Sequence, residues 1–217
     1  MPLTVQHVRD WLERSASVLA ENVQLLTDLD AAIGDADHGI NMDRGFRKIL
    51  AVHSAGAAGD IGGLLKSAGM ALIGSVGGAA GPLYGTLFLR MAAGTEGRLE
   101  LSDLEVVEMV RRGLEGLQDR GKAGPGAKTM VDAWLPAVDA LQEGVSAGEG
   151  LNSAVHAMVQ AAEAGMRATI PMQASKGRAS YLGERSIGHQ DPGATSTHMI
   201  LQALEDVLRG GPAGRGV

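Results

Sequence analysis

The sequence predicts an all-α domain of about eight helices, and three observations support this fold class. Apolar residues recur at intervals of three and four along most of the chain, which is the period of an amphipathic helix. No segment alternates apolar and polar residues as a half-buried strand does. Aromatic residues make up only 3% of the chain, and its 32 glycines favour closely packed helices. With 217 residues and 45% hydrophobic content, we expect one domain over residues 1–210, followed by a frayed tail at 211–217.

The expected helices follow one another in order along the chain. Thr4 is a good N-cap for a first, long helix that runs unbroken to about Asp30. Ser102 and Glu105 are spaced as a capping box that opens the fifth helix, and Asp191 caps the eighth. The apolar stripes that mark the eight helices span Val5–Leu26, Ile40–Leu50, Ile61–Leu72, Leu83–Met91, Leu104–Leu117, Val131–Leu141, Leu151–Met166 and Met199–Val207.

Residues 169–191 show no helical period and are too many for a simple connection, which indicates a functional loop or lid. This segment carries Lys176, Arg178 and Arg185 against one acid, Glu184, and glycines that permit movement. Such a loop would clamp phosphates and exclude water. A solvated surface loop with ordinary cations is the alternative.

Composition excludes several classes of function. The net charge of −6 argues against a general nucleic-acid binder, which needs a basic face. The absence of cysteine excludes disulfides, thiolate metal sites and a cysteine nucleophile, and it fits a reducing cytoplasm. The first residues lack the basic and apolar regions of a signal peptide. Residues 67–89 are uncharged and long enough to span a membrane, but glycines and Pro82 interrupt them, so we expect two buried helices joined by a glycine-rich turn.

Three aspartates near the end of the first expected helix form the densest cluster of charge. Asp30, Asp35 and Asp37 are followed closely by His38 and by an amide at position 41. Ionised carboxylates brought this close repel one another, so they need a counter-ion. If the chain leaves the helix at the glycine of position 34, the second and third aspartates, two apart on an extended stretch, can converge with the first.

Oxygen ligands of this kind indicate a hard cation, either Mg²⁺ or Ca²⁺. A calcium-binding loop starting at Asp35 would need an oxygen ligand, a glycine and a glutamate where Gly39, Ile40 and Phe46 stand, so that template fails. Mg²⁺ fits better because it completes its shell with water and substrate phosphates. In a plainer interpretation, Asp37 only caps a helix that starts near Gly39.

Two glycine-rich stretches are candidate phosphate sites. Residues 74–83 end in Pro82, which suits the first position of a helix, and the glycines before it let backbone N–H groups approach an anion. Close helix crossing would use the same glycines. Residues 121–129 imitate a P-loop, but Ala127 separates the last glycine from Lys128 and no strand precedes them. This second stretch is a candidate turn beneath a nucleotide, and His38 is a candidate donor to a phosphate oxygen, although many such histidines are structural.

Four blocks of this sequence resemble the nucleotide-binding L subunits of phosphoenolpyruvate-dependent dihydroxyacetone kinases. The blocks are Ile33–Met42, Ser75–Thr86, Lys128–Met130 and Lys176–Ser196, of which the last is the most specific, and the similarity covers nearly the whole chain. The resemblance implies an eight-helix antiparallel barrel or bundle with ADP and two Mg²⁺ at one end. In that family the nucleotide stays bound, receives a phosphoryl group from a phosphohistidine on a phosphotransferase-system partner, and passes it to dihydroxyacetone on a K subunit.

Carried over by position, the resemblance implies that Asp30, Asp35 and Asp37 hold the magnesium ions and that His38 and Arg178 are catalytic. The implied nucleotide contacts are His38, Gly39, Ile40, Asn41, Ala79, Ala80, Gly121, Met130, Arg178, Asp191, Pro192 and Gly193. The chain departs from the family twice: Ala80 replaces a common serine and leaves only its N–H for a phosphate, and Ala127 replaces a common aspartate that would cap the turn.

The resemblance thus implies a cytoplasmic phosphotransferase with the K subunit and the phosphohistidine-bearing subunit as partners, and with no nucleic-acid or membrane partner. The oligomeric state, a homodimer included, stays open. A first alternative is a free-standing relative of the C-terminal domain of ATP-dependent dihydroxyacetone kinases, which exchanges ATP and does not retain ADP. A second is a nucleotide-sensing subunit that binds a transcriptional regulator and catalyses nothing itself. A metal-dependent phosphohydrolase is a third.

Overall fold

The computed structural model describes residues 2–56 and 59–210, so the expected tail at 211–217 lies outside the described residues. The described part is almost entirely helical, which confirms the predicted all-α class. Its elements are β1 (Leu3–Thr4), α1 (Val5–Glu21), α2 (Val23–Ile33), α3 (His38–Ser54), α4 (Ile61–Ser75), α5 (Ala80–Ala92), β2 (Glu100–Leu101), α6 (Asp103–Gly121), α7 (Val131–Ser146), α8 (Leu151–Ala168), the 3-10 helix η1 (Arg178–Ser186) and α9 (Pro192–Leu208).

The long first helix of the sequence prediction is in fact two helices, which meet at Asn22. The side-chain amide of Asn22 donates a hydrogen bond to the carbonyl of Val18 (2.8 Å), and its backbone N–H bonds the carbonyl of Leu19 (3.2 Å). Its backbone leaves the helical region (φ −113°, ψ 17°). An asparagine side chain that competes for backbone groups in this way is a known helix breaker. Asp30 therefore lies on a separate helix, α2.

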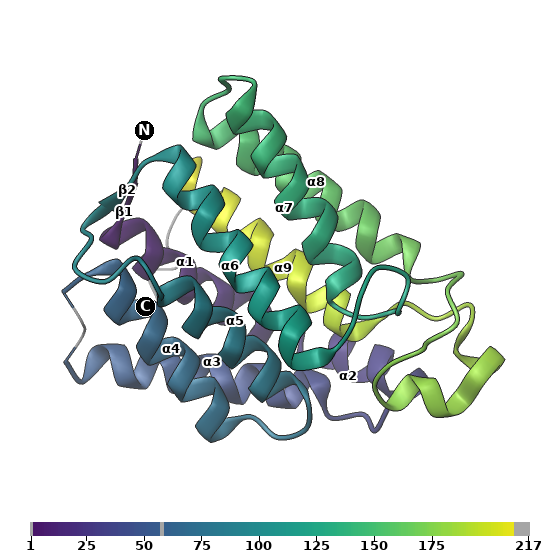
Figure 1. Ribbon diagram of the computed structural model, residues 1–217. Coiled ribbons are helices and arrows are strands. Elements are labelled where there is room, and N and C mark those ends of the chain that lie inside the picture. The colour runs from purple at the N-terminus through teal and green to yellow at the C-terminus, as the bar shows by residue number, and fades with distance from the viewer. Residues whose placement is uncertain (1, 57–58, 211–217) are drawn as a thin grey trace.

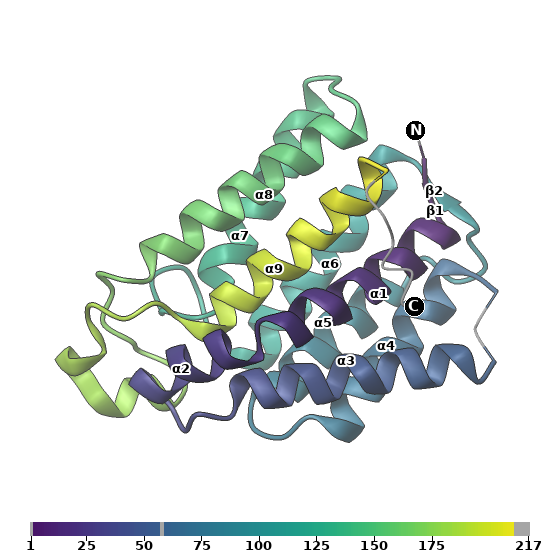
Figure 2. The ribbon, with the colours of Figure 1, turned by 180° about the vertical axis from the view of Figure 1, so that it is seen from behind.

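Within the described part of the chain, eight of the helices pack side by side in a closed ring. In chain order α1, α3, α4, α5, α6, α7, α8 and α9 each contact the next, and α9 returns to contact α1. This ring is consistent with the expected barrel. The short helix α2 extends beyond α1 and contacts α3, α9 and η1. Figures 1 and 2 show α2 and η1 at one end of the ring, while the antiparallel pair β1 and β2 lies at the other end.

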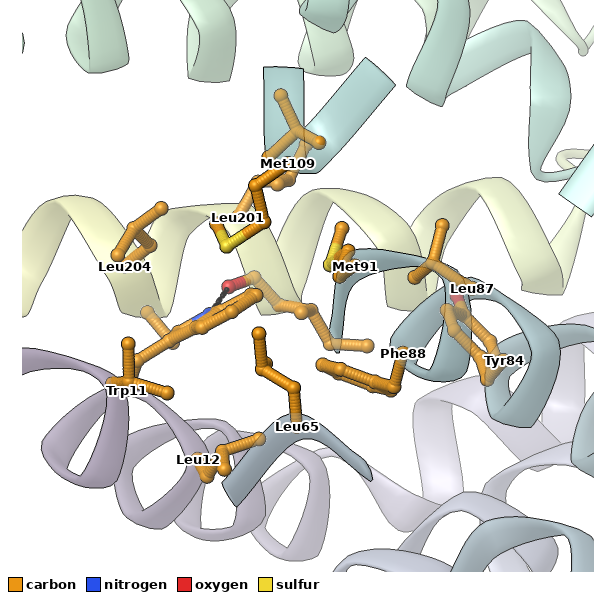
Figure 3. Close-up of a cluster of buried hydrophobic side chains, with 14 of the residues drawn as sticks. Trp11, Leu12, Leu65, Tyr84, Leu87, Phe88, Met91, Met109, Leu201 and Leu204 are labelled. Atoms are coloured by element: carbon orange, nitrogen blue, oxygen red, sulfur yellow. Dashed lines mark hydrogen bonds between the residues drawn. The ribbon is translucent and has the colours of Figure 1, made fainter. Parts of the chain in front are cut away.

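The inside of the ring is filled by apolar side chains from helices distant in sequence (Figure 3). Trp11 of α1 packs on Phe88 of α5 with ring centroids 5.8 Å apart, and the indole N–H donates to the carbonyl of Ile200 in α9 (2.7 Å). Burial of such side chains supplies most of the favourable free energy of folding. Because core packing holds the helices in the ring, it also determines the positions of their ends.

The expected caps are present. The hydroxyl of Thr4 accepts the N–H of His7 at the start of α1 (3.2 Å), and the carboxylate of Asp191 accepts the N–H of Ala194 at the start of α9 (2.7 Å). The carboxylate of Glu105 accepts both the N–H and the hydroxyl of Ser102 at the start of α6. These bonds pair backbone N–H groups that have no partner inside a helix.

The uncharged stretch at residues 67–89 divides between α4 and α5, with residues 76–79 as the connection, as the sequence predicts. Among the described residues, none of the helices combines the length and the apolar character needed to cross a bilayer. The start of α5 differs from expectation: the helix begins at Ala80, so Pro82 is its third residue and not its first. Proline is still accommodated there because the N–H groups of a first turn have no partner within the helix.

Candidate functional site

One cavity at the α2 end of the ring brings together most of the residues that the sequence predicts to be functional. The cavity is lined by all three aspartates of the cluster, by the starts of α3, α5 and α9, and by η1. The predicted site residues among its lining are Asp30, Asp35, Asp37, His38, Asn41, Ala79, Ala80, Met130, Arg178, Asp191, Pro192 and Gly193. The predicted site residues lie in five separate segments of the chain, and the fold brings these segments together.

Three predicted nucleotide contacts lie outside this lining. Gly39 packs against α2, where an added Cβ would stand 2.1 Å from the carbonyl oxygen of Val23. The side chain of Ile40 is 49% exposed. Gly121 and Met130 line a second, adjoining cavity of about 440 Å³ whose walls are mainly apolar. The two cavities adjoin, so together they form one elongated site; the residues that line both are Ala79, Leu83, Thr129, Met130, Lys176 and Gly177.

The aspartates form a tight cluster of carboxylates. One carboxylate oxygen from each of Asp30, Asp35 and Asp37 lies within 4.8 Å of the others. Asp30 is buried and its Oδ2 accepts the backbone N–H groups of Asp37 (2.9 Å) and His38 (3.2 Å), so it caps α3 from the neighbouring helix. Asp37 occupies the N-cap position but its side chain makes no capping bond. Capping by Asp37 therefore does not explain the cluster.

The turn between α2 and α3 brings the aspartates together. An added Cβ on Gly34 would stand 2.0 Å from Oδ1 of Asp30, so only glycine lets the chain pass this close to the carboxylate. Ala36 has a left-handed backbone (φ 61°). The expected extended stretch is thus a tight turn, and an alanine held in this region stores some strain, as is common at ligand sites.

The donor set fits a hard divalent cation. It consists of carboxylate oxygens, and it leaves room on the cavity side for water or phosphate, which is the coordination that Mg²⁺ prefers. The guanidinium of Arg178 lies 2.9 Å from Oδ2 of Asp35, so η1 already contributes one positive charge to the cluster. Three carboxylates against one arginine still leave a net negative charge that favours cations.

Helix N-termini in the same cavity favour anions, in contrast to the carboxylates, which favour cations. The helices α3, α5 and α9 begin at His38, Ala80 and Pro192, and all three residues line the cavity. The helix dipole favours an anion at each of these ends, although Asp30 already accepts the N–H of His38 and Asp191 that of Ala194. At Ala80 the backbone N–H is available even though the expected serine hydroxyl is missing.

His38 is held by hydrogen bonds that the sequence did not predict. Its Nε2 shares a hydrogen bond with the hydroxyl of Ser196 (2.9 Å), which in turn bonds the hydroxyl of Tyr84 (2.8 Å). Tyr84 also bonds Thr197 (2.9 Å) and the carbonyl of Gly193 (3.2 Å). Burial lowers the pKa of His38 to about 4, although the carboxylates of the cluster oppose this shift, so the ring is neutral at pH 7.

Asp191 has its predicted role as the cap of α9 in a buried position. Burial raises the pKa of Asp191 to about 7, against the opposing effect of the N–H of Ala194. Its backbone N–H donates to the hydroxyl of Thr169 (3.0 Å). Because the carboxylate already accepts a helix N–H, contact with a nucleotide through Asp191 stays a prediction.

The connection from α6 to α7 is not a P-loop, since a helix precedes it. The carboxylate of Asp132 accepts the N–H groups of Gly126 and Thr129 (2.8 Å to the latter), so the turn is capped although Ala127 has no side chain to do so. The carbonyl of Ala127 accepts the N–H of Ser175 (3.2 Å), which joins this turn to the segment that carries Arg178.

The fold and the site together define a class of protein: an all-helical domain whose ring of helices presents a carboxylate cluster and several helix N-termini to one cavity. Residues 32–206 match the DAK2 domain family. The chain belongs to this family.

Curated relatives of similar length share much of the sequence. The chain is 48% identical over 204 residues to the ADP-binding subunit of the PEP-dependent dihydroxyacetone kinase of Escherichia coli (strain K12), covering 94% of this chain and 97% of that protein. It is 39% identical to the ADP-binding subunit of the PTS-dependent dihydroxyacetone kinase of Lactococcus lactis, covering 95% and 99%. Human triokinase/FMN cyclase is 34% identical, but the match spans only 34% of that longer protein.

Solved structures share the fold. The chain superimposes on the dihydroxyacetone kinase of C. freundii in its native form with a TM-score of 0.73 and 26% identity, over 92% of this chain and 34% of that one. The complex of the same enzyme with AMP-PNP and Mg²⁺ gives a TM-score of 0.73 and 27% identity, over 95% and 34%.

Proposed function

We propose that this chain is the ADP-binding subunit of a phosphoenolpyruvate-dependent dihydroxyacetone kinase. In this function a phosphoryl group passes from a phosphohistidine on a phosphotransferase-system subunit, through the bound nucleotide, to dihydroxyacetone held by a K subunit. The observation that carries the proposal is the cluster of Asp30, Asp35 and Asp37 in the same cavity as three helix N-termini. Carboxylates favour cations and helix N-termini favour anions, and a metal complex of a diphosphate satisfies both.

We assign two Mg²⁺ ions to the aspartate cluster. A single divalent cation would leave three carboxylates and a diphosphate with a large excess of negative charge, even with Arg178 nearby. When bound, the ions would neutralise charge on the phosphates and hold them in line for transfer. Asp30 is fixed by two backbone N–H groups, so this ligand is already oriented.

Arg178 and His38 are the residues we expect to contact the transferred phosphoryl group. Arg178 reaches the cluster from η1, which places its guanidinium where the oxygens of a metal-bound phosphate would lie. His38 is neutral, so its ring can keep the bond to Ser196 through one nitrogen and use the other toward the ligand. Neither residue needs to form a covalent intermediate, because transfer depends mainly on position and charge.

The two adjoining cavities suggest how a nucleotide would be oriented. Phosphates would lie near Ala79, Ala80 and Gly193, where backbone N–H groups of helix starts are available. The base would enter the mainly apolar cavity lined by Gly121 and Met130. Of the remaining predicted contacts, Asn41, Asp191 and Pro192 line the phosphate cavity. Gly39 and Ile40 do not line it, so they would contribute only by forming the first turn of α3.

Similarity to separate ADP-binding subunits supports partner chains. The chain is 48% identical to the Escherichia coli subunit and matches 97% of it, whereas it is 34% identical to human triokinase/FMN cyclase. By analogy with that subunit, we expect the substrate-binding and donor functions on partner chains. The K subunit and the phosphohistidine-bearing subunit are the partners we propose, in the cytoplasm. A transcriptional regulator and a second copy of this chain are the alternative partners.

A charge-removing substitution tests the metal assignment. Protein loaded with Mg²⁺ and ADP would be desalted, and its nucleotide and metal measured by mass spectrometry and elemental analysis. We expect about one ADP and two Mg²⁺ per wild-type chain, and loss of both in Asp35→Asn because the lost charge unbalances the site. Asp28→Asn is the matched control, since Asp28 is exposed on α2, which leads into the turn that carries Asp35, and bonds only Gln24 (2.7 Å) in the described structure. Unchanged ADP content in Asp35→Asn would refute the assignment.

The phosphoryl donor is tested by reconstitution. Purified chain, a K subunit and dihydroxyacetone would be combined either with phosphoenolpyruvate and the phosphotransferase-system proteins or with ATP alone. We expect product only with the first donor, and ADP that survives desalting. Rapid ADP loss with turnover on ATP alone would favour the ATP-exchanging alternative. Bound nucleotide without any transfer would favour the regulatory subunit, and phosphate release without acceptor would favour a phosphohydrolase.

A further inference from the structure

Lys128 is buried beside the candidate site, yet the proposed function gives it no role. Its exposed fraction is 1%, and among the described residues it is the one lysine or arginine that is buried. It lies on the connection between α6 and α7 with a left-handed backbone (φ 59°). Burial of a lysine disfavours its charged form and is tolerated only when the ammonium is well paired.

The ammonium of Lys128 is paired with backbone carbonyls and not aimed at the centre of the cavity. Its Nζ donates to the carbonyl oxygens of Thr169 (2.7 Å), Met172 (3.2 Å) and His189, with Ile170 at the edge of hydrogen-bonding distance (3.5 Å). An ammonium has three N–H groups, so the longest contact shares a donor with another. A lysine next to a glycine-rich turn suggests a phosphate ligand, but here its donors are already in use.

The carbonyls that Lys128 binds belong to both ends of one segment. Three lie at the start of residues 169–191 and one, that of His189, lies at the end. Two further bonds join the same ends: Gly188 N–H to the carbonyl of Ile170 (2.8 Å), and Asp191 N–H to the hydroxyl of Thr169 (3.0 Å). These contacts between residues 169–172 and residues 188–191 form a neck from which η1 projects, and the ammonium of Lys128 lies at its centre.

We propose that Lys128 is a positioning residue that closes this neck and so holds Arg178 and the start of α9 against the carboxylate cluster. Arg178 lies beyond the neck and bonds Asp35, while Asp191 lies at the end of the neck and caps α9, so both depend on the two ends staying together. Without the ammonium, four carbonyl dipoles would converge on an apolar space, and the ends would separate. This proposal deepens the proposed function, since its consequence is slow release of nucleotide.

Hydrogen exchange of the nucleotide-free protein tests the neck independently of any ligand. Lys128→Met keeps the length of the side chain and removes its charge, and Lys122→Met is the matched control because Lys122 is exposed on the same connection and is also left-handed (φ 49°). In Lys128→Met we expect at least tenfold faster exchange at the amides of Ser175, Gly188 and Asp191, with α1, α4 and α5 as protected as in the wild type. Exchange equal to that of Lys122→Met, or faster exchange throughout the chain, would overturn the proposal.

Nucleotide release gives the functional readout. With Mg²⁺ and ADP, we expect release at least tenfold faster from Lys128→Met than from the wild type, and no change in Lys122→Met. Fast release with a fully protected 169–191 segment would overturn the positioning role and indicate direct contact with phosphate. If the wild type itself binds no ADP, the proposed function fails, while the exchange experiment still decides the role of Lys128.

Lys128→Arg covers the case in which the methionine variant does not fold. Arginine keeps the charge, but its planar donors cannot all point at carbonyls that converge on one nitrogen. We expect the amide exchange rates of residues 169–191 in Lys128→Arg to lie between those of the wild type and those of Lys128→Met. If Lys128→Met does not fold, the rates in Lys128→Arg should still exceed those of the wild type. Two results together would overturn the proposal. The first is that amide exchange in Lys128→Arg equals that of the wild type, and the second is that the Nζ–H groups of Lys128 in the wild type exchange as fast as those of an exposed lysine.

Discussion

The end of the ring that carries β1 and β2 differs from the end that carries the carboxylate cluster in where its charged and polar groups lie. At the first end, α1 and α6 begin with caps from Thr4 and Ser102 near the surface. The buried carboxylate of Glu205, in the last turn of α9, is paired there with Arg209 (2.6 Å). At the second end Asp30, Lys128 and Asp191 are buried. Buried charges destabilise the folded state unless they are well paired, whereas surface caps only stabilise it. We infer that the polar groups of the first end stabilise the fold and that those of the second end bind a ligand.

This difference predicts how substitutions at the two ends behave. A change at the carboxylate end should alter ligand binding at least as much as the free energy of unfolding. A change at the β1 and β2 end should alter only the free energy of unfolding. Three substitutions test this contrast, beginning with the largest expected effect.

Gly34→Ala should have the largest effect. The new Cβ would stand 2.0 Å from Oδ1 of Asp30, so the carboxylate must move out of the cluster. We expect a loss of about 1–3 kcal/mol in the free energy of unfolding from overpacking, measured by urea denaturation without ligand. Mg²⁺ and ADP affinity, measured by calorimetry, should fall at least tenfold.

Gly74→Ala is the control for this substitution, because an added Cβ there meets no atom within 4 Å. It lies in α4, where alanine is the better helix former, so its stability should be equal or slightly higher. Retained affinity in Gly34→Ala would show that Asp30 can move without loss of the site, and the contrast between the two ends would be broken.

Tyr84→Phe should have an intermediate effect. The substitution removes one buried hydroxyl from Ser196, Thr197 and the carbonyl of Gly193 but keeps the ring in the core. We expect a loss of about 1–2 kcal/mol in the free energy of unfolding and weaker ADP binding, because Ser196 would hold His38 less firmly. Tyr181→Phe is the control, since Tyr181 is 89% exposed. Equal stability of the two variants would contradict the role of the hydroxyl.

Glu105→Gln should have the smallest effect, confined to stability. The N–H and hydroxyl of Ser102, together with Arg98, lower the pKa of Glu105 to about 2. Because this pKa lies below the unfolded value, the charged cap stabilises the fold above about pH 4.5, and that contribution is lost as the pH falls toward 2. The stability difference between the wild type and Glu105→Gln should therefore shrink over this range in thermal unfolding.

ADP binding by Glu105→Gln should equal that of the wild type, since the cap is at the far end of the ring. Glu115→Gln, which removes an exposed charge from the same helix, is the control. A change in ADP affinity in Glu105→Gln would mean that the two ends are coupled.

Local signals in the sequence predicted much of the fold and the site. Thr4, Glu105 and Asp191 were recognisable as caps because capping depends on residues three apart. The aspartates were recognisable because like charges at such density have few structural explanations. Their relation to Arg178 followed from the charge balance of its segment and from the family resemblance, and the ion pair with Asp35 agrees with it.

Interactions between distant segments could not be predicted in this way. The helix break at Asn22 is different, because its bond to the carbonyl of Val18 is local; the apolar pattern, which continues through the break, concealed it. The partnership of Tyr84 with Ser196 joins residues 112 apart, and that of Lys128 with Thr169 joins residues 41 apart. Such contacts depend on how the ring closes, which is a property of the core and not of any one motif.

Closure of the ring by α9 has a consequence for the chain during its synthesis. The bond between Trp11 and the carbonyl of Ile200 joins groups 189 residues apart, so α1 has no partner on that side until α9 has left the ribosome. The same late segment brings Asp191 to the cavity and Ser196 to the ring of His38. A nascent chain thus completes its core and this cavity in one final step, and an unfinished copy would present to a chaperone the apolar groove that α9 later fills.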